Sequence, residues 1–189
     1  MKAYPLKTAR NLYLSTITRP LAEMGYYVFP VAVIDVLIKE NGVPSPEDMA
    51  EVPLSKIQEV INPDAVLYMT VVEWGTKYRV IDSVTIVHVK GSLIDTNTGI
   101  VLWEGEHTVT ESSSSGQNSI IGMLVAALVN QIVTSFSDPS RDVARATNAQ
   151  LFLNQHNGLL LGPRHSQFEM DQRDHRALQN QTISESSRP

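Results

Sequence analysis

The segment ESSSSGQNSIIGMLVAALVNQIVTSF, residues 111–136, constrains the fold more than any other part of the chain. Its apolar centre, residues 120–129, ends where Asn130 and Gln131 interrupt it. A membrane-spanning helix needs about 20 mainly apolar residues, so this run is too short. As a helix it has one broad apolar face and a separate small and polar stripe, which favours a helix packed on the protein's own sheet. A partly exposed, partner-binding helix and a membrane span are the alternatives. The serine-rich part before it is expected to be a flexible connector.

The composition is that of a globular protein, because 42% of the residues are hydrophobic and 19% are charged. A chain of 189 residues suits one domain with an appendage. The net charge of −5 provides no basic surface for nucleic acid. The sequence has no cysteine, which excludes disulfides, thiolate metal sites and a cysteine nucleophile. Residues 1–14 lack the continuous apolar stretch of about 7–15 residues that a secretory signal needs, so no export signal is expected in this chain.

Hydrophobic periodicity divides the chain into helices and strands. Helices are predicted at 6–24, 35–41 and 138–154, with two short helical turns between 43 and 61; strands are predicted at 26–34, 64–74, 79–94 and 100–110. These elements predict an α/β (α+β) fold, with a mixed, largely antiparallel sheet and helices packed on it. Residues 1–165 are expected to form this single domain. The polar residues 166–189 are expected to form a disordered tail.

The last two strands form a hairpin whose register can be argued from the sequence. Placing Ile94 opposite Ile100 separates polar from apolar side chains, whereas a slip by one residue mixes them. The same register pairs Lys90 with Glu104, His88 with Glu106, Gly91 with Trp103, and Leu93 with Val101. It also turns His88 and His107 to opposite faces of the sheet.

Few residues suggest chemistry. The common phosphate-binding, nucleophile-elbow and zinc motifs are absent from the sequence. The pairs formed by Lys90 and His88 are interpreted as solvated ion pairs, each contributing less than about 1 kcal/mol. We therefore expect no catalytic, cofactor-binding or metal-binding residues, and a protein that is not an enzyme.

Contact with a partner is the remaining expectation, and two apolar segments are the candidates. The first is the apolar face of residues 120–136, and the second is the segment GLLLGPR. The predicted contact residues are Ile121, Leu124, Leu128, Leu159, Leu160 and Leu161. Self-association into a homo-oligomer is a further possibility left open by the pattern.

Five separated blocks resemble one family of bacterial lipoproteins of unknown function, in order and in spacing. The blocks are RPLAEMGYYVFPVAVID (19–35), DAVLYMTVVEWGTKY (64–78), LIDTNTGIVLWEGE (93–106), IIGMLVAALVNQI (120–132) and NGLLLGPRH (157–165). The resemblance covers about residues 15–170. It implies an α/β fold similar to that of the curli-secretion lipoprotein, of lipoprotein activators of peptidoglycan synthases, and of the N-terminal domain of the Tol system's propeller protein.

The resemblance also implies a place and a role. Members are expected at the periplasmic face of the outer membrane, acting with other envelope lipoproteins, including curli-secretion-like ones, in assembly or transport. They are made with a signal and a lipobox cysteine; residues 1–15 contain neither, so membrane attachment is expected only through a lipid anchor that this chain lacks. No catalytic residues are implied. The alternative function is a periplasmic binding module, in which His88, Lys90 and Ser92 would hold a small molecule or a peptidoglycan fragment.

Overall fold

The computed structural model describes residues 6–42, 48–78, 83–112, 139–154 and 157–186. The elements are α1 (Leu6–Glu23), α2 (Val31–Glu40), the 3-10 turn η1 (Asp48–Glu51), α3 (Leu54–Ile61), β1 (Ala65–Tyr78), β2 (Ser83–Asp95), β3 (Val101–Ser112), α5 (Pro139–Phe152) and α6 (Phe168–Ser186). Within these ranges, no helix is both long enough and apolar enough to cross a membrane.

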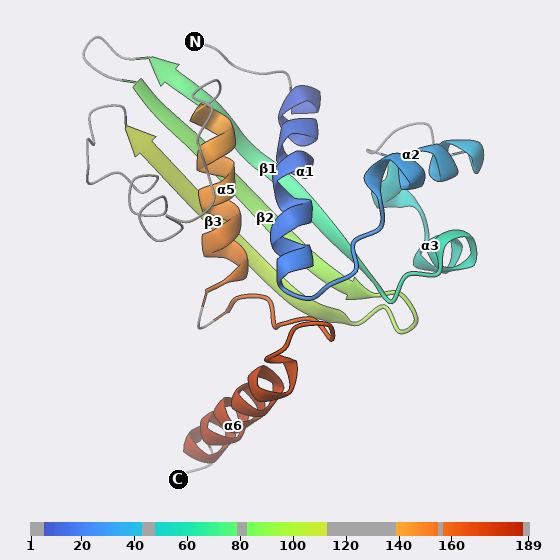
Figure 1. The fold of residues 1–189 in the computed structure, drawn as a ribbon, viewed down its shortest axis with the longest axis vertical. Coiled ribbons are helices and arrows are strands. Elements are labelled where there is room, and N and C mark those ends of the chain that lie inside the picture. The colour runs from blue at the N-terminus through green and yellow to red at the C-terminus, as the bar shows by residue number, and fades with distance from the viewer. Residues whose placement is uncertain (1–5, 43–47, 79–82, 113–138, 155–156, 187–189) are drawn as a thin grey trace.

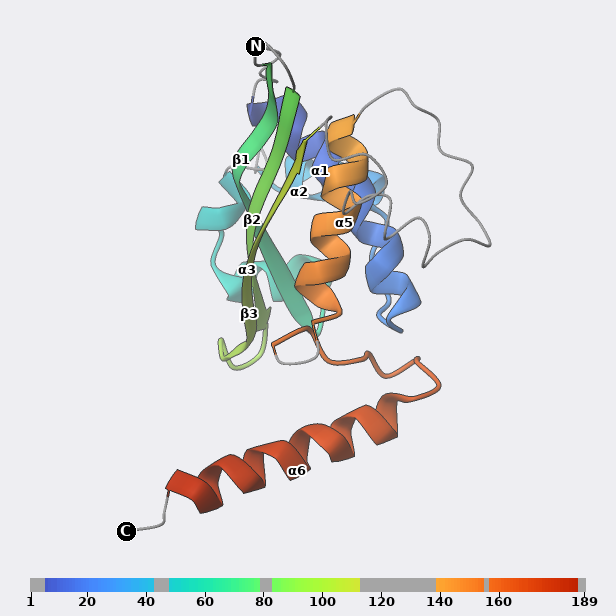
Figure 2. The ribbon, with the colours of Figure 1, turned by 90° about the vertical axis from the view of Figure 1, so that its left-hand side faces the viewer.

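The strands form an antiparallel sheet in the order β1-β2-β3. Helices α1 and α5 lie side by side across one face of this sheet (Figures 1 and 2). Helices α2 and α3 lie beside β1, apart from the α1–α5 layer (Figure 1). The predicted α/β fold with helices packed on an antiparallel sheet is therefore confirmed.

The core lies between the α1–α5 layer and the sheet. Its buried side chains include Tyr13, Ile17 and Leu21 from α1, Trp74, Val87, Val89 and Val109 from the strands, and Val143, Leu151 and Phe152 from α5. The ring of Tyr13 meets that of Trp74 edge-on at 6.2 Å, and Phe152 lies 5.7 Å from Trp103. Each buried apolar side chain of this size contributes about 1.5–3 kcal/mol relative to an exposed one.

The hairpin register differs from the predicted one by two residues. Lys90 lies opposite Glu106 instead of Glu104, and Gly91 lies opposite Gly105 instead of Trp103. The cause is local: the carboxylate of Asp95 accepts hydrogen bonds from the chain that follows it, and the register shifts once more at a bulge beside Ile94. From Leu93 toward the start of β2 the shift is even, so the side chains of those pairs keep their predicted face, whereas Val101, which lies opposite Ile94, does not.

The predicted strand at residues 26–34 is wrong. Residues 31–40 are α-helical, so the helix expected from residue 35 begins four residues earlier. The first turn closes on the carbonyl of Pro30, which accepts from the amides of Val33 and Ile34. An apolar run without a polar face fits a buried strand and an apolar helix equally well, so periodicity alone did not separate them.

Residues 166–189 were predicted to be a disordered tail, but residues 168–186 form helix α6. Figures 1 and 2 show α6 extending away from the sheet and its covering helices. The amide of Leu161 donates to the carboxylate of Asp171 at 2.8 Å, which fixes the start of the helix. The prediction read low hydrophobicity as disorder, but Glu, Gln, Arg, Ala and Leu are good helix formers and no glycine or proline interrupts them.

Candidate contact surface

An exposed apolar surface covers α2 and the chain that leads into it. Its large side chains are Tyr27, Phe29, Val31, Val33 and Val36, which we call the α2 surface. Tyr27 is 59% exposed, Val33 is 56% exposed and Val36 is 55% exposed. No residue of α2 is buried. A helix that is apolar on most sides normally lies inside a protein or against a partner, so this exposure is unusual.

The local sequence dictates where α2 begins and ends. Pro30 precedes the first helical residue with a φ of −59°, which suits a helix start. At the other end, Gly42 adopts a φ of +87°, a conformation that favours glycine and ends the helix. Lys39 and Asp35, one turn apart, form an exposed ion pair at 2.5 Å. The helix is therefore well defined although little of it is covered.

One side of α2 faces α3. The two helices enclose a small gap lined by Ile38 and Asn41 from one side and by Ile57 and Val60 from the other. Ile57 is buried, so α3 has its own apolar anchor. The opposite side of α2 has a shallow groove of about 340 Å³, lined by Ala32, Val33, Val36, Leu37 and Glu40. This groove offers one carboxylate and otherwise aliphatic carbon, which suits an apolar partner rather than acid–base chemistry.

A backbone clasp holds the chain just before the α2 surface. The amide of Gly162 donates to the carbonyl of Met24 at 2.8 Å, and the amide of Arg164 donates to that of Gly25 at 3.1 Å. The approach is so close that a Cβ at Gly25 would lie 2.3 Å from the nitrogen of His165. Two segments far apart in the sequence are thus fixed to each other, and this fixes the direction in which residue 26 onward leaves the domain.

Tyr26 strengthens the clasp through its side chain. Its hydroxyl donates to the carbonyl of Leu160 at 2.6 Å. Burial of the ring, with a smaller contribution from the nearby carboxylate of Asp171, raises the pKa of Tyr26 to about 12. The phenol therefore stays neutral and keeps its hydrogen bond throughout the physiological pH range.

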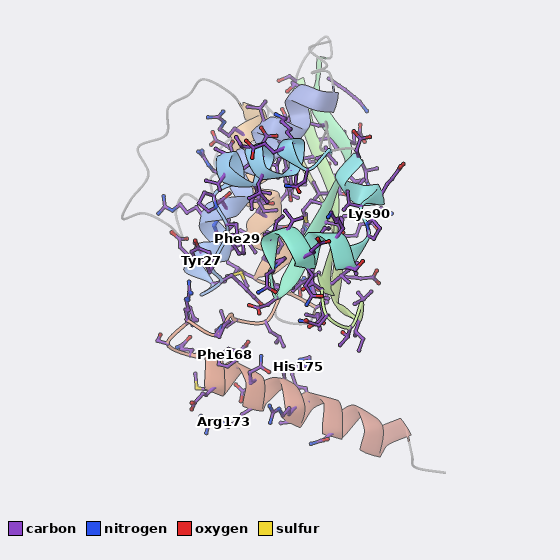
Figure 3. The ribbon with its side chains drawn as sticks, turned by 90° about the vertical axis from the view of Figure 1, so that its right-hand side faces the viewer. Tyr27, Phe29, Lys90, Phe168, Arg173 and His175 are labelled. Carbon is purple, nitrogen blue, oxygen red and sulfur yellow. The ribbon has the colours of Figure 1, made fainter. Side chains whose placement is uncertain are left out.

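Tyr27, by contrast, points outward. Its ring contacts that of Phe29 at 5.2 Å in an edge-on arrangement, and the guanidinium of Arg164 lies 4.9 Å from its centre. Figure 3 shows Tyr27 and Phe29 close together below α2, with Lys90 well away from them on the sheet. The two rings therefore extend the aliphatic surface of α2 toward the clasp.

The second candidate surface is the sheet face that carries His88, Lys90 and Ser92. Glu106 accepts from His88 at 2.7 Å and pairs with Lys90 at 3.1 Å. The predicted pair of His88 and Glu106 is thus present, although the two are diagonal neighbours, whereas Lys90 pairs with Glu106 rather than with Glu104. These hydrogen bonds, first from His88 and then from Lys90, hold the pKa of Glu106 below its ordinary value.

The six predicted contact residues have different positions in the structure. Ile121, Leu124 and Leu128 lie outside the described residues. Leu159 belongs to the core, while Leu160 and Leu161 are half-buried. The segment GLLLGPR therefore offers a partner little more than Leu160 and Leu161, because it packs on its own domain through Leu159 and through the clasp.

The histidines on the hairpin lie on opposite faces, as predicted. His88 shares the solvent-facing side with Glu106, whereas His107 lies toward α5, where its Nε2 is 2.6 Å from Oε1 of Gln150. This contact supplies the polar partner that the sequence did not reveal for a histidine on an apolar face. Among the residues that the structure describes, no three His, Asp or Glu side chains are grouped as a metal site.

Sequence reasoning missed the α2 surface, although the sequence does carry a signal for it. Residues 31–38 contain a single charged residue, Asp35. Once these residues are helical, their apolar side chains point in every direction and cannot all be covered by one neighbour. A prediction that places this run in a buried strand does not lead to an exposed surface.

Comparison with known proteins gives consistent results. The family described as "Putative lipoprotein GNA1162-like" matches residues 5–164. A protein of Neisseria meningitidis serogroup B, described as a putative lipoprotein, is 41% identical over 152 residues, which cover 80% of this chain and 71% of that protein. The crystal structure of lipoprotein GNA1162 from Neisseria meningitidis is 43% identical and superposes with a TM-score of 0.54, covering 62% of this chain and 82% of that one.

These matches confirm the resemblance and the fold. The family match extends over most of the chain, and the related crystal structure has the same architecture at substantial sequence identity. Lipoproteins are proteins of the cell envelope, which is the location that this relationship suggests. The chain belongs to the GNA1162-like family of lipoproteins.

Proposed function

We propose that this chain is the folded part of a cell-envelope lipoprotein that works through protein–protein contacts and catalyses no reaction. Its place is the periplasmic face of the outer membrane, and its process is envelope assembly or transport. The observation that carries the proposal is the α2 surface, five large apolar side chains gathered on one exposed helix and its approach.

The chemistry of this surface indicates what kind of partner it suits. Exposed apolar area is stabilised when water leaves it, by roughly 25 cal/mol per Å². The aliphatic groove of α2 offers few hydrogen-bonding groups, so a small polar substrate gains little there. A protein surface with its own aliphatic side chains fits better, and the partners we propose are envelope lipoproteins, whether other ones or further copies of this chain.

Binding of a small molecule or a peptidoglycan fragment by His88, Lys90 and Ser92 has weaker support. Glu106 already pairs with both His88 and Lys90, so their donors are engaged within the sheet face. An anionic fragment would have to displace that carboxylate. Titration with cell-wall fragments, followed by the amide NMR signals of β2, distinguishes this alternative: shifts confined to β2 and β3 would favour it over our proposal.

Photo-crosslinking in cells tests the proposal directly. A photoreactive amino acid replaces Val33 on the α2 surface, and in a matched variant it replaces Leu153, which is 60% exposed at the end of α5. We expect the Val33 variant to form adducts with one or a few envelope proteins that mass spectrometry identifies. The Leu153 variant should form few adducts or none.

Two results would contradict the proposal. One is equal crosslinking from both positions, which would mean that the α2 surface is no more engaged than any exposed site. The other is an absence of adducts at Val33 in membranes where the protein is abundant and correctly folded.

A further inference from the structure

We infer that the occupant of the α2 surface is a second copy of this chain, with the two α2 helices antiparallel across a two-fold axis near Val36. This inference depends on the proposed function only in taking the α2 surface to be a contact surface. It adds the identity of the partner and the geometry of the pair.

The first support is the arrangement of side chains along the exposed side of α2. Ala32, Val36 and Glu40 follow one another at intervals of four residues, so they lie along one line of the helix, with Val33 and Leu37 beside them. Val36 is at the centre of this line. Two such faces, brought together antiparallel, place small and medium aliphatic side chains against each other with Val36 at the middle.

The second support is charge. Asp35 and Lys39 lie on one flank of that face and already pair within the helix. In an antiparallel pair each flank meets the same flank of the other copy, so Lys39 comes beside the second copy's Asp35, and this happens twice because of the symmetry. A parallel pair would instead place this flank against the opposite flank of the second copy, where Val33 and Leu37 offer no opposite charge. The charge pattern therefore complements itself only in the antiparallel arrangement.

The charges also disfavour a lipid surface as the occupant. The α2 face is bordered by Asp35, Lys39 and Glu40, which together carry more negative than positive charge, and the whole chain carries −5. Helices that lie on anionic bilayers are instead rich in Lys and Arg.

The size of the surface indicates how strong the pair should be. A single helix face with two flanking rings is smaller than the roughly 800 Å² per partner of a standard stable interface. We therefore expect a dimer with a dissociation constant of roughly micromolar or weaker.

Engineered cysteines provide a direct test, because the chain has none of its own. Val36→Cys, close to the two-fold axis, should form a disulfide-linked dimer on mild oxidation. Ala32→Cys alone should not, since a rise of 1.5 Å per residue places the two copies of residue 32 about 12 Å apart. An equimolar mixture of Ala32→Cys and Glu40→Cys should link. Leu153→Cys serves as the exposed control and should stay monomeric.

A charge exchange provides a second test in the full chain, by sedimentation velocity across a concentration series. Asp35→Lys should raise the dissociation constant by about tenfold, because two repulsive contacts replace two attractive ones. The double exchange Asp35→Lys, Lys39→Asp should restore it to within about threefold. Exchanging the exposed pair of Arg19 and Glu23 on α1 in the same way should change nothing. Circular dichroism melts establish that each variant is folded.

Each contrary result has a separate meaning. Self-linking of Ala32→Cys would overturn the antiparallel geometry. Val36-dependent flotation with phosphatidylethanolamine–phosphatidylglycerol vesicles, without any dimer, would make a lipid surface the occupant. A purified monomer that never links at Val36→Cys, together with Val33 adducts to a different protein in cells, would overturn the second copy and leave the proposed function standing. If Val36→Cys forms no disulfide-linked dimer and Val33 forms no photo-adduct, both the second copy and the proposed function are overturned.

Discussion

Helix α2 is mostly apolar but exposed, whereas helix α5 is mostly polar but has a buried face. Seven of the ten residues of α2 are apolar, yet none is buried. Helix α5, PSRDVARATNAQLF, is much more polar, yet Val143, Ala144, Thr147, Asn148 and Phe152 are all almost fully buried. Hydrophobicity summed over a helix therefore does not say whether its own chain covers it.

The difference lies in what each helix meets. Small residues on α5 let it approach α1 and the sheet closely, and the amide of Asn148 donates to Thr16 of α1 at 3.0 Å. Helix α2 borders a small gap shared with α3 on one side, and Val31, Val33 and Val36 are exposed. A polar helix can thus belong to the core of the domain, while an apolar helix can remain largely exposed.

The largest effect is expected where α5 meets the sheet. Phe152→Ala removes a ring that is 1% exposed and lies against Trp103, so we expect the free energy of unfolding to fall by about 3–5 kcal/mol. Leu153→Ala, its exposed neighbour, should change it by less than about 0.5 kcal/mol. Urea unfolding followed by tryptophan fluorescence measures both. Similar losses for the two variants would contradict the conclusion that α5 is anchored in the core through Phe152.

The clasp beside α2 should be the next most sensitive site. Gly25→Ala combines a φ of +90° with a clash against the backbone of His165, and we expect a loss of about 1–3 kcal/mol. Gly42→Ala is the matched control, because its φ is +87° and nothing lies within 4 Å of the added Cβ. A smaller loss for Gly42→Ala in thermal unfolding isolates the cost of the close approach. Equal losses would mean that backbone strain alone matters.

Tyr26→Phe should have a smaller effect on the free energy of unfolding, and this effect should shrink at alkaline pH. Loss of the hydrogen bond to Leu160 should cost about 1 kcal/mol at pH 7. Because the pKa of Tyr26 is raised from 10.0 to about 12 in the folded state, the wild type should keep this contribution below pH 10 and lose it as the pH rises toward 12. Denaturant titrations at several pH values should show a flatter alkaline decline for the variant. The same slope in both proteins would contradict the assignment.

The smallest effect is expected on the sheet face that carries Glu106. Its pKa is lowered by the hydrogen bonds from His88 and Lys90, so its contribution to stability is present above its ordinary pKa of 4.5 and is lost as the pH falls through the lower, folded value. Glu106→Gln should therefore weaken the acid dependence of the urea midpoint slightly and change little at pH 7. A large loss at pH 7 would mean that this exposed group is more than a solvated ion pair.

Sequence reasoning succeeded where the hydrophobic periodicity fitted a single type of secondary structure. Trp74 and Phe152 lie in elements with clear periodicity, and both the strands and α5 were predicted close to their observed positions. It failed where the deciding contact was local, as at the Asp95 turn that shifts the hairpin register. It also failed at Val31–Ile34, since an apolar run carries no information on whether a sheet or a partner covers it. The α2 surface became visible only when the fold showed which of the described side chains are exposed.

Hydrogen–deuterium exchange of the full chain, measured over a range of protein concentrations, distinguishes α5, which its own domain covers, from α2, which we propose is covered by another copy. We expect amides of α2 to become more protected as the protein concentration rises, while amides of α5 stay equally protected throughout. Protection of α2 that does not change with concentration would contradict this proposal.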